Sequence, residues 1–193
     1  MAKSSGRTIT PLERFALSTA QRMGLSKTVQ AQIITPQGGL LLAVNGGGLG
    51  GADSGADTTA LRTDATSPGA WGSFTFVVRG KHFALRTAKG YYVTAVDGGG
   101  VGDTLVEEGL HQPLVTNGTA SSLYTIFTLI PLTGDQIAIR TPDQQHYVTA
   151  VDGGGVAGRG RVPLRTNTKT AGGNGWFTLT ILSLLTQSHN GPN

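Results

Sequence analysis

The ten residues "YVTAVDGGGV" occupy Tyr92–Val101, and the same ten letters return at Tyr147–Val156. A looser copy, "LLLAVNGGGL", lies at Leu40–Leu49. The copies start 52 and 55 residues apart, so this chain of 193 residues contains a threefold internal repeat. A fixed period of this length indicates a fold in which one supersecondary unit recurs.

Each copy of the phrase belongs to a longer shared pattern. An apolar segment ending in Thr precedes the phrase, a Leu-x-Thr segment follows it, and each copy closes on Phe-Thr and an apolar residue. These segments begin at Ala31, Phe83 and Ile137, at Ala60, Pro113 and Pro163, and at Phe74, Phe127 and Phe177. Short β-branched runs bounded by Gly, Asn, Asp and Pro are typical of strands, so we expect about four strands per copy and about twelve in all.

The phrase itself predicts a strand that runs into a tight glycine turn. Asp-Gly or Asn-Gly directly after an apolar run is a strong turn signal, because Gly reaches positive φ without a steric cost. We therefore expect at least one glycine with positive φ in each of Gly98–Gly100 and Gly153–Gly155.

Three copies favour a closed all-β architecture. Propellers usually need four or more blades, whereas closure removes the exposed strand edges that invite aggregation. A β-trefoil with pseudo-threefold symmetry fits an all-β domain with three copies best.

The pattern also resembles the fascin-like branch of the β-trefoil superfamily. The resemblance rests on "LRTAKGYYVTAVDGGG" at Leu85–Gly100, "IRTPDQQHYVTAVDGGG" at Ile139–Gly155 and "WGSFTF" at Trp71–Phe76, and it covers about residues 29–182. It implies the trefoil fold, and it adds the cross-linking of actin filaments as a candidate function. The Gln-x-Trp endings of ricin-type lectin repeats are missing, so their sugar site is not carried over.

The repeats divide the chain into three parts. We expect a basic N-terminal extension at residues 1–28, a single trefoil at 29–186 and a flexible tail at 187–193. Within the trefoil the repeats cover about 29–80, 81–135 and 136–186.

The extension contains the signals of one short amphipathic helix. In "TPLERFALSTAQRMG", Thr10 is placed to cap the N-terminus, Pro11 to occupy the first turn, Glu13 to complete a capping box and Gly24 to end the helix. A helix of this length is marginal alone in water. We therefore expect it to pack on the barrel, on a partner or membrane surface, or on a second copy of the chain.

Composition and charge exclude several classes of function. Cysteine is absent, which excludes a disulfide scaffold and thiolate chemistry. Residues 1–28 carry five Lys and Arg against one Glu, a net charge of +4, whereas residues 29–193 carry ten basic and ten acidic residues. The basic excess thus lies outside the repeats, and we expect no sequence-specific nucleic-acid binding. Neither a transmembrane stretch nor a signal peptide is recognised, so we expect a cytoplasmic protein.

No catalytic constellation stands out in the sequence. The four histidines form neither an H-x-x-x-H nor an H-E-x-x-H pattern, so we expect no metal site. No Gly-x-Ser-x-Gly occurs, and "GGGLGG" at Gly46–Gly51 is not followed by the Gly-Lys-Ser/Thr of a phosphate loop. We therefore expect a binding module that is not an enzyme and needs no cofactor.

Asn45, Asp97 and Asp152 occupy the same place in the three copies. One interpretation is structural, since Asn and Asp side chains cap turns through neighbouring backbone amides. The other is functional, with the three side chains acting as polar hooks for sugar hydroxyls.

The third repeat differs from the others in charge. Residues 136–186 contain five Lys and Arg against two Asp, a net charge of +3, whereas the first two repeats have −1 and −2. Three of these cations, Arg159, Arg161 and Arg165, lie close together in "GRGRVPLRTNTK". They form either a solvated face or a patch for an anion or an acidic partner.

Glycan binding at shallow repeated sites is the favoured function, and binding or cross-linking of an acidic partner such as an actin filament is the alternative. A carboxylate accepts paired sugar hydroxyls better than an amide does. We therefore expect the second and third repeats to bind a neutral sugar better than the first. The arginines near the third repeat should make it the most tolerant of an acidic sugar.

Overall fold

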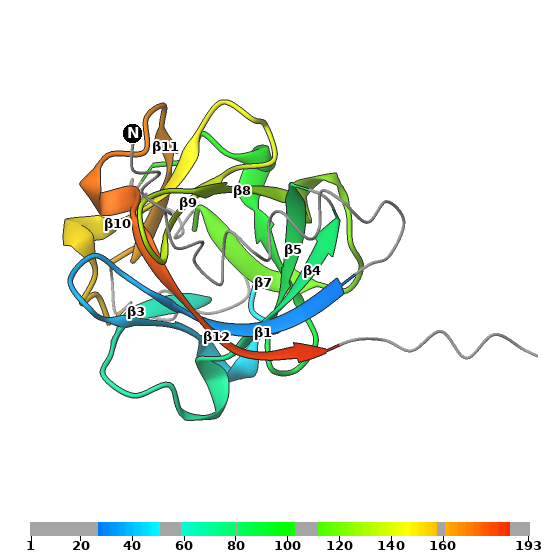
Figure 1. Cartoon of the computed structure of the whole chain (residues 1–193). Helices are drawn as coiled ribbons and strands as arrows, with labels where there is room; N and C mark the ends of the chain where they lie inside the picture. Colours follow the sequence, from blue (N-terminus) through cyan, green and yellow to red (C-terminus); the bar gives the residue numbers. More distant parts are fainter. Residues whose placement is uncertain (1–26, 51–58, 80, 103–111, 158–160, 186–193) are drawn as a thin grey trace, which may run out of the picture.

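The computed structural model describes residues 27–50, 59–79, 81–102, 112–157 and 161–185 (Figure 1). Within these ranges the chain forms twelve β-strands and six short 3-10 turns. The strands are β1 (Lys27–Ile34), β2 (Leu40–Ala43), β3 (Leu61–Ala65), β4 (Phe74–Arg79), β5 (His82–Arg86), β6 (Tyr92–Ala95), β7 (Leu114–Gly118), β8 (Phe127–Pro131), β9 (Gln136–Arg140), β10 (Tyr147–Ala150), β11 (Leu164–Thr168) and β12 (Phe177–Leu185). The turns are η1 (Val44–Gly46), η2 (Gly69–Trp71), η3 (Val96–Gly98), η4 (Leu123–Thr125), η5 (Val151–Gly153) and η6 (Gly173–Gly175). The predicted all-β fold with four strands in each repeat is confirmed.

Six of the strands close into an antiparallel barrel. β1 pairs with β4 and β12, β5 pairs with β4 and β8, and β9 pairs with β8 and β12. The last strand thus lies beside the first, as Figure 1 shows for β12 (red) and β1 (blue). Each repeat supplies its first and fourth strands to this ring, and the closed ring leaves no barrel edge unpaired.

The second and third strands of each repeat form a hairpin outside the ring. The hairpins are β2–β3, β6–β7 and β10–β11. Each has a register shift at the same place, between Leu40 and Leu42, between Tyr92 and Thr94, and between Tyr147 and Thr149. The pseudo-threefold symmetry predicted from the repeats therefore extends to irregularities of the strand pairing.

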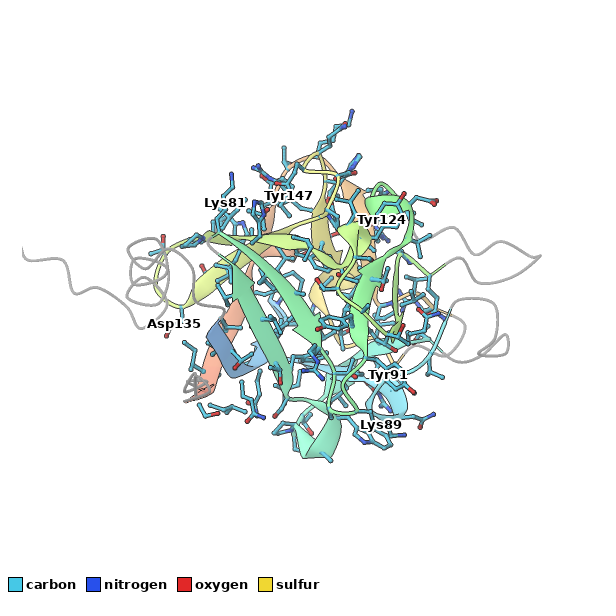
Figure 2. All side chains as sticks on the ribbon, turned by 90° about the vertical axis from the view of Figure 1, so that its right-hand side faces the viewer. Lys81, Lys89, Tyr91, Tyr124, Asp135 and Tyr147 are labelled. Atoms are coloured by element: carbon cyan, nitrogen blue, oxygen red, sulfur yellow. The ribbon has the colours of Figure 1, made fainter. Side chains whose placement is uncertain are left out.

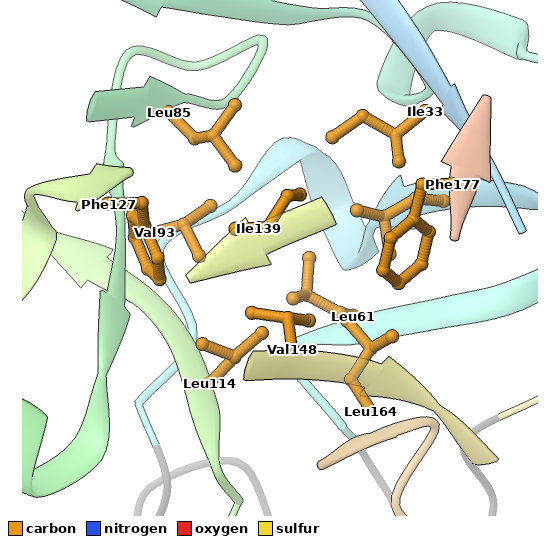
Figure 3. A pocket seen from close by; sticks show the side chains of 11 residues that line it. Ile33, Leu61, Leu85, Val93, Leu114, Phe127, Ile139, Val148, Leu164 and Phe177 are labelled. Atoms are coloured by element: carbon orange, nitrogen blue, oxygen red, sulfur yellow. The ribbon is translucent and has the colours of Figure 1, made fainter. Parts of the chain in front are cut away.

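Equivalent residues of the three repeats meet in one core. Phe74, Phe127 and Phe177 begin β4, β8 and β12, and their exposed fractions are 0%, 1% and 1%, as the repeat predicts. Three further sets of equivalent apolar residues join them, namely Ile33, Leu85 and Ile139, Leu41, Val93 and Val148, and Leu61, Leu114 and Leu164. Figure 3 shows side chains of this core pointing toward one another from all three repeats, among them Phe127, Phe177 and Ile33. Burial of this apolar surface is the main force that holds the repeats together.

The repeated phrase connects each repeat to the next. Its last glycine donates its amide to a threonine carbonyl of the following repeat: Gly48 to Thr116 at 2.8 Å, Gly100 to Thr166 at 2.8 Å and Gly155 to Thr63 at 3.0 Å. The third repeat thus binds the first, so the connections form a closed cycle. The phrase occurs three times because the ring has three such connections.

The backbone of the phrase also explains its residue types. Four consecutive residues have positive φ in each copy, at 45–48, 97–100 and 152–155. The prediction of a positive-φ glycine in each triplet is confirmed, and all three glycines of each triplet meet it. The first of the four residues is Asn or Asp, the residue types other than Gly that most readily adopt the left-handed conformation.

Two predicted segments lie outside the described residues. These are the helix within residues 11–23 and the tail at 187–193. β1 begins at Lys27, inside the segment predicted as the extension. In the part of the chain that the structure describes, no helix is long and apolar enough to cross a membrane.

Candidate functional site

The interior of the barrel holds a small apolar cavity. Its volume is about 20 Å³, and all eleven residues that line it are apolar (Figure 3). A volume of this size is close to that of a single water molecule, and a cavity without polar partners stays dry. This cavity is therefore too small and too apolar to hold a sugar or another organic ligand.

Three surface junctions between repeats share one backbone arrangement. Junction 1 joins residues 45–49 to residues 88–91, junction 2 joins residues 97–101 to residues 142–146, and junction 3 joins residues 152–156 to residues 36–39. In each of them an amide of the second segment donates to the carbonyl of the first glycine of the phrase. The three bonds run from Lys89 to Gly46, from Asp143 to Gly98 and from Gln37 to Gly153, and each is 3.0 Å long. Side chains at equivalent positions can therefore be compared directly between the junctions.

The predicted site residues Asn45, Asp97 and Asp152 lie one at each junction. All three are exposed and have φ of 55°, 53° and 52°. In the described ranges, the side chains of Asn45 and Asp97 make no hydrogen bond with the protein, so they do not cap the turn. Their residue type suits the left-handed backbone, and their polar atoms remain available to a ligand.

At junction 3 the aspartate has a protein partner. The Arg161 guanidinium donates to Asp152 Oδ2 at 2.5 Å, with exposed side-chain fractions of 59% and 64%. Exposed pairs of this kind contribute little to stability, but this one occupies an acceptor of Asp152. Arg165 lies in β11 beside Thr149 of β10 and is half-buried. Arg159 lies outside the described residues.

Aromatic side chains accompany the phrase at two of the junctions. A Cβ placed on Gly46 would lie 3.2 Å from Trp71 Cδ1, and one placed on Gly98 would lie 3.3 Å from Tyr124 Cδ1. Trp71 is 43% exposed and Tyr124 is 49% exposed, so each ring covers a glycine and still faces solvent. At junction 3 the equivalent neighbour is the amide of Asn174.

The following repeat contributes a second set of variable side chains. Tyr91 lies against Gly48 at junction 1, and His146 lies against Gly100 at junction 2. Gly39 holds the equivalent place at junction 3, since its carbonyl accepts from Thr35 as those of Tyr91 and His146 accept from Thr87 and Thr141. Figure 2 shows Lys89 and Tyr91 close together, with Tyr124 on a separate part of the molecule.

The junctions therefore differ in charge although their backbones match. Junction 1 has Asn45 and Lys89, junction 2 has Asp97 and Asp143, and junction 3 has the Asp152–Arg161 pair. The sequence predicted the Asn or Asp of each phrase as a site residue. It did not predict the aromatic residues Trp71 and Tyr124, or the side chains that the following repeat contributes to each junction. The aromatic three residues before Phe74 and Phe127 was the one available signal.

Asp143 organises the turn of junction 2. Its Oδ1 accepts from the Thr141 hydroxyl at 2.7 Å and from the Gln145 amide at 2.9 Å, and its Oδ2 lies 2.5 Å from His146 Nδ1. Burial by itself would raise the pKa of the carboxyl, but these hydrogen bonds outweigh it and lower the pKa to about 2. No group of three or more His, Cys, Asp or Glu side chains within the described ranges could hold a metal ion.

The lowered pKa predicts an acid-dependent contribution of Asp143 to stability. Because the folded pKa of about 2 lies below the unfolded value of 3.8, the ionised carboxylate stabilises the fold above that value, and this contribution is lost as the pH falls toward 2. We expect Asp143→Asn to lower the free energy of unfolding by about 1 kcal/mol at pH 6, a figure reduced for partial solvation. Urea unfolding of both proteins at pH 6, 4 and 2 measures the difference. A difference that does not shrink at low pH would contradict the prediction.

Comparison with known proteins shows the fold. No protein-family model matches the sequence, and no curated protein matches it significantly. Among solved structures, the designed threefold-symmetric protein ThreeFoil superposes with a TM-score of 0.61 at 12% identity, over 79% of this chain and 99% of that one. The fold is a β-trefoil.

Two natural structures share the trefoil fold with this chain. The Rhizoctonia solani agglutinin has a TM-score of 0.55 at 14% identity, over 83% of this chain and 99% of that one. The Polyporus squamosus lectin, solved with Neu5Acα2-6Galβ1-4GlcNAc, has a TM-score of 0.54 at 11% identity, over 82% of this chain and 51% of that one. At such identities the likeness shows the trefoil fold alone, and the fascin-like subtype is not confirmed.

Proposed function

We propose that this trefoil is a non-catalytic carbohydrate-binding module whose sugar sites are junctions 1 and 2. The observation that carries the proposal is the pairing of an exposed aromatic ring with an exposed Asn or Asp that has no hydrogen bond in the described part of the protein. Trp71 accompanies Asn45, and Tyr124 accompanies Asp97. The C–H face of a sugar packs on an aromatic ring, and its hydroxyls donate to a carboxylate or amide oxygen.

Junction 2 is the proposed main site for a neutral sugar. Asp97 offers a carboxylate that accepts no hydrogen bond from any described residue, and the ring of Tyr124 covers the next residue, Gly98. Junction 3 has an aspartate as well, but Arg161 engages it and Asn174 replaces the ring. We therefore expect the second repeat to bind a neutral sugar more tightly than the third. The sequence alone did not distinguish these two repeats.

Each site is shallow, so single sites should bind weakly. Two sites on one trefoil that engage one branched or clustered glycan would add by avidity. The agglutinin and the lectin with this fold are consistent with such a use, which for this chain remains the proposal.

The proposal predicts that two substitutions at junction 2 weaken sugar binding. A glycan array on the full chain identifies a neutral glycan, and titration then compares the wild type with Asp97→Asn and Tyr124→Ala. We expect each variant to lose about tenfold in affinity, which is about 1.4 kcal/mol. Asn suits the left-handed position, since Asn45 holds it at junction 1, so Asp97→Asn should leave the fold intact.

Matched controls are available for both substitutions. Leu123→Ala removes an exposed side chain next to Tyr124, and Asp135→Asn removes an exposed carboxylate in the turn between β8 and β9. Both should bind as the wild type does.

Actin co-sedimentation, run in parallel, tests the fascin-like alternative. Sedimentation with filaments and no glycan bound on the array would overturn the carbohydrate proposal.

A further inference from the structure

Junction 1 is distinguished by the cation Lys89, which has no acidic neighbour in the described ranges. Lys89 makes no ion pair there, and its equivalents at the other junctions are Asp143 and Gln37. Arg86 of β5 extends along the same turn, where its Nε donates to the Gly90 carbonyl at 3.3 Å and its guanidinium lies 5.6 Å from the centre of the Tyr92 ring. Arg140 holds the equivalent place at junction 2, so Lys89 alone sets junction 1 apart. Among the described residues of the adjacent β2–β3 hairpin, the acidic side chain is Asp64, and Arg62 engages it at 2.6 Å.

The aliphatic part of the Lys89 side chain and the indole ring of Trp71 both lie against Gly46. A Cβ placed on Gly46 would lie 3.2 Å from Lys89 Cγ, 3.2 Å from Trp71 Cδ1 and 3.3 Å from Trp71 Nε1. Gly46 is buried beneath these two side chains, whereas Lys89 and Trp71 are both exposed. The Tyr91 ring lies two residues further along the phrase, over Gly48, where a Cβ would lie 3.1 Å from Cε2.

The indole N–H of Trp71 is available as a donor. In the described part of the chain it donates to no protein atom, whereas the N–H of Trp176, which is equally exposed, donates to the Ala171 carbonyl at 2.7 Å. Ammonium and indole groups are donors only. A donor-rich surface that contains a positive charge and two rings is complementary to an anion attached to a ring with an apolar face.

We infer that junction 1 binds the anionic group of an acidic saccharide, either a carboxylate or a sulfate. The inference rests on the proposed carbohydrate function and deepens it for this junction. Lys89 Nζ and Trp71 Nε1 donate to the anion, the aromatic rings pack on the sugar ring, and Asn45 binds a hydroxyl. Junction 2, with Asp97 and Asp143, repels the same anion, so one trefoil has two sugar selectivities.

The inference changes the expectation drawn from sequence for acidic sugars. Sequence composition favoured the third repeat because of Arg159, Arg161 and Arg165. In the structure, Arg161 forms an ion pair with Asp152. Lys89 at junction 1 has no such partner in the described ranges. A cation that is already neutralised attracts an added anion less than a free one does.

The test uses the full chain and three probes that differ only in one group. The first is an oligosaccharide that ends in glucose. The second ends in glucuronic acid in place of the glucose, and the third ends in glucose that carries a sulfate group. The wild type should bind at least one anionic probe about tenfold more tightly than the neutral probe at low salt, and the preference should fall as salt is added. Comparison of the two anionic probes distinguishes a carboxylate from a sulfate site.

Three variants assign the preference to Lys89. Lys89→Gln, which introduces the residue found at position 37, should abolish the preference, and Lys89→Arg should retain it. Lys81→Gln removes an exposed cation at the turn between β4 and β5 and should change nothing. Equal binding of the anionic probes by Lys89→Gln and the wild type, or an equal loss in Lys81→Gln, would overturn the inference.

Failure of the inference can be separated from failure of the proposed function. If the neutral probe binds and depends on Asp97 and Tyr124 while Lys89→Gln has no effect, only the inference is overturned. If neither neutral nor anionic probes bind, both are overturned. A melting curve for each variant shows whether it is folded. If Lys89→Gln fails to fold, the wild type still tests the inference, because a wild type that binds the neutral and anionic probes equally at low salt would overturn it.

Discussion

Replacement of Gly154 by alanine should destabilise the trefoil by about 4 kcal/mol, from backbone strain and overpacking together. Gly154 has φ 124° and ψ −168°, a region that is essentially restricted to glycine. A Cβ at this position would lie 2.2 Å from Thr35 Oγ1 and 2.7 Å from Thr35 Cβ. Thr35 is buried in the first repeat, so the added methyl group pushes apart the third and first repeats where the ring closes.

Two other glycines separate the causes of this loss. Gly134 has φ 66° and open space around its Cβ position, and Gly172 has φ −72° and open space as well. Gly134→Ala should cost about 1 kcal/mol from backbone strain alone, and Gly172→Ala should cost close to nothing. Urea unfolding of the three variants measures the series. If Gly154→Ala and Gly134→Ala lower the free energy of unfolding equally, the close contact of Gly154 with the first repeat does not contribute to the loss.

Replacement of Phe177 by alanine should cost about 3–5 kcal/mol. The side chain is 1% exposed and lines the small cavity inside the barrel. Its removal enlarges a void that the rigid ring of strands cannot collapse to fill. Phe74 and Phe127 hold equivalent positions, so alanine should have a similar effect at both.

Leu182 provides the matched control on the same strand. It also lies in β12, but it is 47% exposed. Leu182→Ala should therefore change the free energy of unfolding by less than about 1 kcal/mol. Denaturant titrations of both variants, with the slope compared to that of the wild type, give the two values. A loss for Phe177→Ala no larger than that for Leu182→Ala would contradict the placement of Phe177 in the core.

Local patterns of this sequence were sufficient to predict the fold. Phe74, Phe127 and Phe177 could be identified as core residues because the same spacing recurs in each copy. The glycine turns could be identified because Asp-Gly or Asn-Gly directly after an apolar run signals a turn that contains a positive-φ glycine. Both signals depend on short segments of chain, and each is repeated three times.

The composition of the sites could be predicted only in part. Asn45, Asp97 and Asp152 stand out in the sequence because they share a place in the repeat. Their neighbours Lys89, Asp143 and Gln37 come from the following repeat, and Gln37 donates to the carbonyl of Asp152 across 115 residues. A repeat pattern states which positions are equivalent, but it does not state which turn packs against which phrase.

The sequence by itself therefore determined the repeat, the strands, the glycine turns and the core, because these depend on local conformation and on periodic burial. Only the tertiary structure decided which side chains share a junction, because ring closure brings each phrase against the first turn of the next repeat. Packing between repeats placed Lys89 beside Trp71 and Gln37 beside Asp152. Three nearly identical backbones thereby acquire different charges, and that difference separates the proposed neutral-sugar site from the proposed acidic-sugar site.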